Sequence, residues 1–216
     1  MYLGNFIKKL DKKYNKVYFS GIAFNSAKVK KDYIFFAIKG NNFDGNNYIQ
    51  EAIEKGAKVV VSEKKINFQN KDVIYLKSKN SRKLLAELSY KFIKKNVKKL
   101  IAVTGTNGKS SVADFYYQIL NLSKKRAASI GTIGIQSKNK KKEIENTTLN
   151  PIELSKIIND LGFKKIDHII LEASSHGLKQ NRLDGLSFDL GIFTNLSHDH
   201  LDYHKNFRDY LNSKLY

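Results

Sequence analysis

Apolar positions divide the chain into two halves, in each of which short apolar runs alternate with segments of helical periodicity. In the first half, nearly continuous apolar runs predict three buried strands, at residues 32–38, 57–61 and 73–76. Between the first two, residues 48–55 have apolar side chains on one helical face, and Gly56 follows as a stop signal. Ser81 is the expected N-cap of a further helix that runs to about residue 95 and joins the halves.

The second half follows the same alternation with longer helices. Its strands are expected at residues 99–103, 127–135, 168–171 and 188–193. Gly131 and Gly134 interrupt the second of these strands. A helix is expected to be capped by Asn150 and to run to Leu161, with Gly162 as its stop signal. Residues 138–145 are polar and should form a connection outside the core. Strands that alternate with helices imply a parallel sheet with both faces covered.

A glycine-rich segment follows the first strand of the second half. Residues 105–111, with the sequence Gly-Thr-Asn-Gly-Lys-Ser-Ser, fit a turn between a strand and a helix that begins near Lys109. Such a turn directs backbone N–H groups and a helix N-terminus at one point, which suits a phosphate group. Lys109 adds a positive charge, and the Ser110 hydroxyl is a ligand for Mg²⁺. The general P-loop pattern has a glycine where this chain has Val103, so a glycine-rich turn without a ligand is the alternative.

Acidic and imidazole side chains follow two later strands of the same half. Glu172 comes directly after the strand at 168–171, and the next strand leads into a segment with three histidines and two aspartates within seven residues, 198–204. Because the carboxyl ends of parallel strands meet at one edge, we expect Glu172 to meet a Mg²⁺ held by Ser110, or otherwise to cap the next helix. The histidine-rich segment suits a cation or a phosphate. A dedicated zinc site is the weaker option, because phosphate chemistry prefers Mg²⁺ with oxygen ligands.

Composition narrows the classes of protein that fit. The chain has 216 residues and a formal net charge of +19, which invites a nucleic-acid interpretation. Only four of its 39 basic residues are arginine, and the lysines are spread along the whole chain, so no nucleic-acid partner is expected. There is no cysteine for a disulfide or a thiolate metal site, and no apolar run is long enough for a membrane span or a signal peptide. These features are compatible with a cytoplasmic protein.

Three motifs in register resemble those of the Mur ligases, and they lie at residues 105–111, 172–182 and 193–204. Three shorter segments are similar to the N-terminal, UDP-binding domain of that family, at 25–30, 36–40 and 44–45. The resemblance implies an α/β fold in two parts. A small N-terminal α/β UDP-binding domain would occupy residues 1–80, followed by a connecting helix at 81–97. A truncated P-loop-type parallel-sheet ATPase domain would occupy 98–216.

The resemblance also implies an activity. Mur ligases of peptidoglycan synthesis join an amino acid to the free carboxylate of a UDP-linked muramoyl peptide, here the UDP-muramoyl dipeptide. ATP first phosphorylates the carboxylate, and the incoming amine then displaces phosphate, so the protein's task is positioning and charge neutralisation. The expected partners are ATP, Mg²⁺, the UDP-muramoyl dipeptide and either diaminopimelate or lysine.

Roles follow for individual residues where the motifs match. The expected ATP-binding set is Gly105, Thr106, Asn107, Gly108, Lys109, Ser110 and Ser111. The expected catalytic set is Lys109, Glu172, His200 and Lys214. Mg²⁺ would be bound by Ser110, Glu172 and His200, and by Lys214 if it is carbamylated. Lys214 falls where the family has a carbamylated lysine, a modification that requires the neutral amine. The muramoyl peptide would contact Asn146, Thr147, Thr148, Ser174, Gln180 and Arg182, and the UDP group would contact Ser26, Asn41, Asn42 and Phe43.

Other assignments remain open. The chain could be another Mur-superfamily amide ligase, such as a folylpolyglutamate synthetase, or a nucleotide-binding remnant without catalysis. The family has a third, C-terminal domain for the incoming amino acid, whereas the sequence ends two residues after Lys214. We therefore expect an N-terminal portion of a split, truncated or incompletely sequenced ligase that is inactive alone. Its last helical turn should fray for want of a packing partner.

Overall fold

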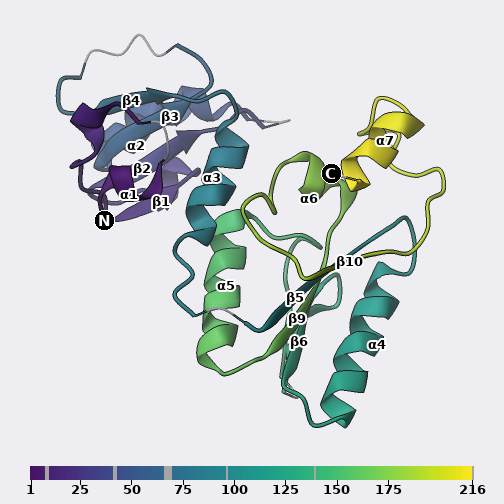
Figure 1. Cartoon of the computed structure of the whole chain (residues 1–216). Helices are drawn as coiled ribbons and strands as arrows, with labels where there is room; N and C mark the ends of the chain where they lie inside the picture. Colours follow the sequence, from purple (N-terminus) through teal and green to yellow (C-terminus); the bar gives the residue numbers. More distant parts are fainter. Residues whose placement is uncertain (8–9, 41–42, 66–69, 96, 139, 216) are drawn as a thin grey trace. The chain divides into compact units, whose positions relative to one another are not determined.

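The computed structural model describes residues 1–7, 10–40, 43–65, 70–95, 97–138 and 140–215. The chain forms two compact α/β units, Met1–Lys91 and Phe92–Tyr216 (Figure 1). Helix α3 (Ser81–Tyr90), which the sequence suggested as the link between the halves, lies inside the first unit. No helix in the described residues is long and apolar enough to cross a membrane.

The first unit is built on a parallel sheet with the strand order β1-β2-β3-β4. Its strands are β1 (Gly21–Ala23), β2 (Tyr33–Ala37), β3 (Ala57–Ser62) and β4 (Ile74–Lys77). Besides α3, its helices are α1 (Leu3–Phe6) and α2 (Ile49–Glu54). The core packs Phe35 and Val60 of the sheet against Ala52 of α2, which confirms three predicted strands and the helix between the first two.

Two details of this unit correct the sequence-based expectation. Asn80, and not Ser81, caps α3, because its side chain accepts a hydrogen bond from the backbone N–H of Lys83. The helix ends at Tyr90, five residues earlier than expected. Gly56 does follow α2, with a φ of +99° that L side chains rarely adopt.

The second unit contains a six-stranded mixed sheet with the order β10-β5-β9-β6-β7-β8. Its strands are β5 (Lys99–Thr104), β6 (Ala127–Gly131), β7 (Gly134–Ser137), β8 (Lys140–Lys142), β9 (His168–Glu172) and β10 (Leu190–Phe193). Its helices are α4 (Lys109–Leu122), α5 (Pro151–Phe163), α6 (Ser175–Lys179) and α7 (Phe207–Lys214). The strands from β10 to β6 are parallel, and α4 and α5 lie on opposite faces of the sheet (Figure 1).

The antiparallel part of this sheet is a correction. The segment expected as one interrupted strand is a hairpin, in which Gly131 of β6 pairs with Gly134 of β7. The polar segment expected as a connection outside the core contributes β8, which pairs with β7. The strand β8 consists of lysines and pairs with β7 at the edge of the sheet, so it leaves no apolar periodicity in the sequence. Helix α5 also continues through Gly162 to Phe163.

The central strands of this sheet are buried, and their carboxyl ends lie at the same edge. Val103, Ile169 and Ile170 are fully buried, and Ala102 and Leu171 are paired neighbours in β5 and β9. Because these strands are parallel and in register, the glycine-rich segment after β5 and the end of β9 emerge at one edge of the sheet.

Candidate active site

The glycine-rich segment forms the expected turn from strand to helix. Strand β5 ends at Thr104 and α4 begins at Lys109, with φ values of +143° at Gly105 and +82° at Gly108. A Cβ atom on Gly105 would lie 1.9 Å from Thr194 Oγ1, so no larger residue fits there. The backbone N–H groups at the start of α4 therefore border this turn, an arrangement that suits an anion.

The segment after β10 holds this turn from the other side. Asn195 accepts a hydrogen bond from Thr106 N through its backbone carbonyl (3.0 Å) and one from Asn107 N through its side-chain oxygen (3.0 Å). Thr194 Oγ1 donates to the Asn107 carbonyl at 2.6 Å, and Ser197 N donates to Thr106 Oγ1 at 2.9 Å. Glycine thus permits the backbone conformation of the turn, and hydrogen bonds from the segment after β10 hold it.

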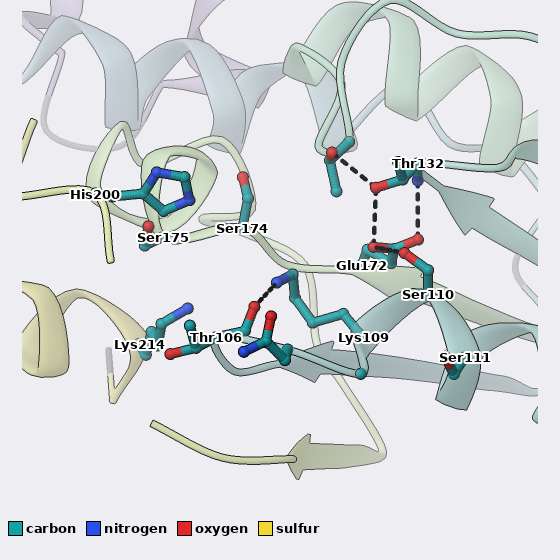
Figure 2. A pocket seen from close by; sticks show the side chains of 13 residues that line it. Thr106, Lys109, Ser110, Ser111, Thr132, Glu172, Ser174, Ser175, His200 and Lys214 are labelled. Carbon is teal, nitrogen blue, oxygen red and sulfur yellow. Dashed lines mark hydrogen bonds between the residues drawn. The ribbon is translucent and has the colours of Figure 1, made fainter. Parts of the chain in front are cut away.

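A cavity of about 390 Å³ opens beside the turn (Figure 2). Segments far apart in the sequence contribute to its wall: the glycine-rich turn, the β6–β7 turn, the residues before α5, the β9–α6 connection, the histidine-rich segment and α7. The lining residues are Thr106, Asn107, Gly108, Lys109, Ser110, Ser111, Thr132, Thr147, Glu172, Ser174, Ser175, His200 and Lys214. All four residues of the expected catalytic set therefore face one space.

Glu172 is the acidic group of the cavity. It is 2% exposed, and its carboxylate accepts hydrogen bonds from Ser110 Oγ (2.9 Å), Thr132 N (2.8 Å) and Thr132 Oγ1 (3.2 Å). Among the described residues, no lysine or arginine forms an ion pair with it. A buried carboxylate whose hydrogen-bond donors are all neutral suits a bound cation, and the hydroxyl oxygen of Ser110 adds a ligand of the type that Mg²⁺ takes.

Two lysines meet at the turn from opposite sides. Lys109 Nζ donates to the carbonyls of Gly105 and Thr106, both at 2.9 Å, and Lys214 Nζ donates to the same Gly105 carbonyl at 2.7 Å. Burial lowers the pKa of Lys109. Burial and the nearby Lys109 charge lower the pKa of Lys214 to about 8. The ammonium of Lys214 also lies 4.6 Å from the ring centre of Tyr210.

The end of α7 is packed and not frayed, which corrects the expectation from the sequence. Tyr210 is fully buried and its hydroxyl lies 3.0 Å from Thr106 Oγ1, while Lys214 is 6% exposed. The sequence did not indicate this packing, because it depends on contacts between residues more than a hundred positions apart, which no local pattern reveals.

The histidine-rich segment is only partly gathered at the cavity. His200 lines it, whereas His198 stacks on Phe207 with ring centres 4.6 Å apart. His204 is 1% exposed and packs edge-on against Tyr210, and burial lowers its pKa. In the described part of the chain, no group of three or more histidine, aspartate or glutamate side chains is placed to hold a metal ion.

Comparison with protein families decides how this cavity is classified. Residues 103–216 match the Mur ligase middle domain. The chain belongs to the Mur ligase family. Residues 18–96 match a second domain of the family, described as the Mur ligase catalytic domain.

Named relatives support this membership. The chain is 45% identical over 199 residues to the UDP-N-acetylmuramoyl-L-alanyl-D-glutamate–2,6-diaminopimelate ligase of Rickettsia conorii, covering 90% of this chain and 41% of the relative. It is 40% identical over 225 residues to the ligase of the same name from Clostridium tetani, covering 100% and 46%. The chain thus spans less than half the length of these curated relatives.

Solved structures give the same result. A structure of a UDP-N-acetylmuramoyl-L-alanyl-D-glutamate–2,6-diaminopimelate ligase matches with a TM-score of 0.83 and 28% identity, over 95% of this chain and 42% of that one. A MurF ligase from Thermotoga maritima in complex with ADP shares the fold, with a TM-score of 0.55 and 21% identity, over 90% of this chain and 42% of its own.

The residues expected to contact the muramoyl peptide fall into two groups. Thr147 and Ser174 line the cavity of this Mur ligase. The others do not line it: Asn146, Thr148, Gln180 and Arg182. Asn146 is exposed.

The remaining three belong to an internal hydrogen-bond network. Thr148 Oγ1 donates to the Glu172 carbonyl at 2.9 Å and accepts from Ser174 N at 2.9 Å. Arg182 donates to the Thr148 carbonyl and to Gln180 Oε1. These side chains therefore organise the loop behind the cavity, and a substrate contact for them rests on the family resemblance alone.

The residues expected at a UDP site belong to the first unit. Ser26 is 7% exposed and its hydroxyl donates to Glu51 Oε2 at 2.8 Å. Phe43 is 70% exposed, and Asn41 and Asn42 lie outside the described residues.

Sequence reasoning missed two residues of the cavity wall, Thr132 and Ser175. Ser175 had a signal, since it lies within the motif at 172–182. Thr132 had none, because only its contacts with Glu172 bring it to the cavity. Sequence reasoning also missed the hydrogen bonds from Thr194, Asn195 and Ser197 to the glycine-rich turn, because the neighbouring histidines were the stronger chemical signal.

Proposed function

We propose that the chain supplies the nucleotide site and the UDP-substrate site of an ATP-dependent ligase of peptidoglycan synthesis. The reaction adds an amino acid to UDP-N-acetylmuramoyl-L-alanyl-D-glutamate through an acyl phosphate. One observation carries the proposal: a single cavity beside the glycine-rich turn is lined by Lys109, Ser110, Glu172, His200 and Lys214, which come from four separate segments. The family membership and the names of the relatives support it.

The chemistry of the cavity suits a nucleoside triphosphate. The N–H groups of the turn and Lys109 would hold the phosphates, and Lys109 can leave the two loop carbonyls because a phosphate oxygen is the stronger acceptor. Ser110 and Glu172 would hold one Mg²⁺, and Glu172 and His200 a second. Bound Mg²⁺ would neutralise charge on the phosphate oxygens as the γ-phosphoryl group is transferred.

Lys214 is the group proposed for carbamylation. A pKa of about 8 leaves more of its amine neutral at physiological pH than an ordinary lysine has, and the neutral amine is the form that reacts with CO₂. The modification would replace a buried cation by an anion next to the proposed Mg²⁺ ligands. Diaminopimelate is the proposed incoming amino acid, because the relatives named above are diaminopimelate ligases.

Calorimetric titration of the 216-residue protein with AMP-PNP and Mg²⁺ tests the nucleotide site. We expect saturable binding at one site, and the absence of binding would overturn the proposal. Titration with UDP-N-acetylmuramoyl-L-alanyl-D-glutamate tests the second site, and a preference for a folate would favour the folylpolyglutamate synthetase alternative. Tripeptide formation by this chain alone is not expected, because the relatives are more than twice as long.

A further inference from the structure

The turn between β6 and β7 is built around the carboxylate of Glu172. Thr132 N donates to Glu172 Oε1 at 2.8 Å, and Thr132 Oγ1 donates to Glu172 Oε2 at 3.2 Å (Figure 2). One residue therefore contacts both oxygens of the acidic group. The third donor is Ser110 Oγ at the start of α4, which donates to Oε2 at 2.9 Å.

The residues that flank Thr132 make this contact possible. A Cβ atom on Gly131 would lie 2.1 Å from Glu172 Oε1, so the backbone at that position can approach the carboxylate only as glycine. Gly134 has a φ of +104°, which returns the chain into β7 after two residues. A hairpin whose tip serves only to join two strands needs neither the close approach of Gly131 nor a side chain that bonds an acid on another strand.

The same hydroxyl extends toward the next wall of the cavity. Thr132 Oγ1 lies 3.0 Å from Thr147 Oγ1. An ionised carboxylate only accepts hydrogen bonds, so the single hydroxyl proton of Thr132 is directed at Glu172, and Thr147 must donate to Thr132. Thr147 consequently keeps only acceptor capacity on the side that faces the cavity.

We propose that Thr132 is a positioning residue that holds the Glu172 carboxylate in the orientation needed to bind the Mg²⁺ of a bound nucleotide. Its backbone N–H fixes one oxygen, and its hydroxyl holds the other against Ser110. Through Thr147, the same hydroxyl links the acidic group to the wall proposed for the muramoyl peptide, where Thr147 would accept an amide N–H. The inference rests on the proposed nucleotide site. It assigns a role to Thr132, which lies outside the sequence motifs that indicated that site.

The test compares nucleotide affinity with and without the metal. Thr132→Val keeps the size, the β-branch and the backbone N–H and removes only the hydroxyl. Calorimetry with AMP-PNP is carried out once with Mg²⁺ and once with EDTA, and the ratio of the two affinities measures the contribution of the metal. We expect this ratio to fall on the order of tenfold in Thr132→Val, with the affinity in EDTA unchanged. Thr132→Ser retains the hydroxyl and should restore the ratio.

A matched control comes from the same hairpin. Ser129 is 4% exposed and its hydroxyl donates to Gln136 Oε1 at 2.6 Å, away from the cavity. Ser129→Ala therefore removes a hairpin hydrogen bond without touching Glu172, and it should leave the ratio unchanged. If Ser129→Ala lowers the ratio as much as Thr132→Val, the role of Thr132 is hairpin stability and the proposal is wrong.

The remaining outcomes separate this inference from the function on which it rests. Mg²⁺-dependent binding that is the same in wild type and Thr132→Val overturns the positioning role and leaves the nucleotide site intact. Failure of the wild-type protein to bind AMP-PNP overturns both. Thermal melting in EDTA checks that each variant is folded, and Thr132→Ala provides the same hydroxyl deletion if the valine variant does not fold.

Discussion

Two loops at the same edge of the second sheet differ in how much of their structure a sequence reveals. The turn at 105–111 follows β5, and the segment at 194–204 follows the neighbouring strand β10. Six of the seven turn residues line the cavity, but only His200 does so from the second segment. The segment with more histidine and aspartate side chains thus contributes fewer residues to the cavity.

The difference lies in what each loop uses to hold its shape. The turn depends on positive φ values at Gly105 and Gly108, which glycine residues in a short motif can indicate from the sequence alone. The histidine-rich segment depends on partners far away in the chain: Thr194 and Asn195 clasp the turn, and His204 is buried against α7. The sequence pattern, which suits a cation or a phosphate, does not reveal that Thr194 and Asn195 hold the turn or that His204 is buried.

The largest effect is expected from the turn glycines, and they can be compared directly. Gly105→Ala places a Cβ 1.9 Å from Thr194 Oγ1 at a φ of +143°, and the strain and overlap should cost more than about 3 kcal/mol of unfolding free energy. Gly108→Ala meets nothing closer than 4.0 Å, so only its φ of +82° opposes the change, at about 1–2 kcal/mol. Urea denaturation measures both. Equal losses would show that contact with the second loop does not constrain the turn.

Lys109→Ala should have the next largest effect, on binding and not on folding. A lysine that donates to phosphate contributes about 1.5–3 kcal/mol, so affinity for Mg²⁺–AMP-PNP should fall by about tenfold to a hundredfold. Lys156→Ala, an exposed charge on α5, is the control for net charge. An unchanged affinity in Lys109→Ala would reject the phosphate assignment of the turn.

The sequence predicted those parts of the fold that rest on local patterns. Strands β2, β3, β5 and β9 are buried apolar runs, and α4 and α5 begin where the glycine turn and Asn150 indicate. Strand β8 was missed because its three lysines are held by backbone pairing, and the packing of α7 was missed because its partner is Gly105. In the site, local motifs identified the catalytic candidates, whereas Thr132 became visible only when the hairpin lay against Glu172.

The histidines of the second loop allow a smaller test within one segment. His200→Ala should lower affinity for Mg²⁺–AMP-PNP by about threefold, since one neutral ligand or hydrogen bond is lost. His198→Ala should leave the affinity unchanged, because this ring stacks on Phe207 and does not line the cavity. Equal effects of the two substitutions would mean that the loop acts through its fold and not through His200.

The smallest effect concerns Lys214 of α7, whose ammonium donates to the same Gly105 carbonyl as that of Lys109. Its pKa of about 8, against an ordinary 10.5, means that folding favours the neutral amine. Protons bound to Lys214 therefore oppose folding below pH 8, and its contribution to stability improves as pH rises from 8 to 10.5.

At pH 7 about one Lys214 amine in ten should be neutral and able to form a carbamate. NMR with ¹³C-labelled bicarbonate should show a carbamate signal that grows as pH rises through 8, and Lys214→Arg should abolish it because a guanidinium stays charged. Lys109→Ala removes a positive charge that lowers the pKa of Lys214, so in this variant the signal should begin at higher pH. A signal that persists in Lys214→Arg would place the carbamate on another amine. An onset that Lys109→Ala does not move would show that burial alone, without the charge from the turn, sets the pKa of Lys214.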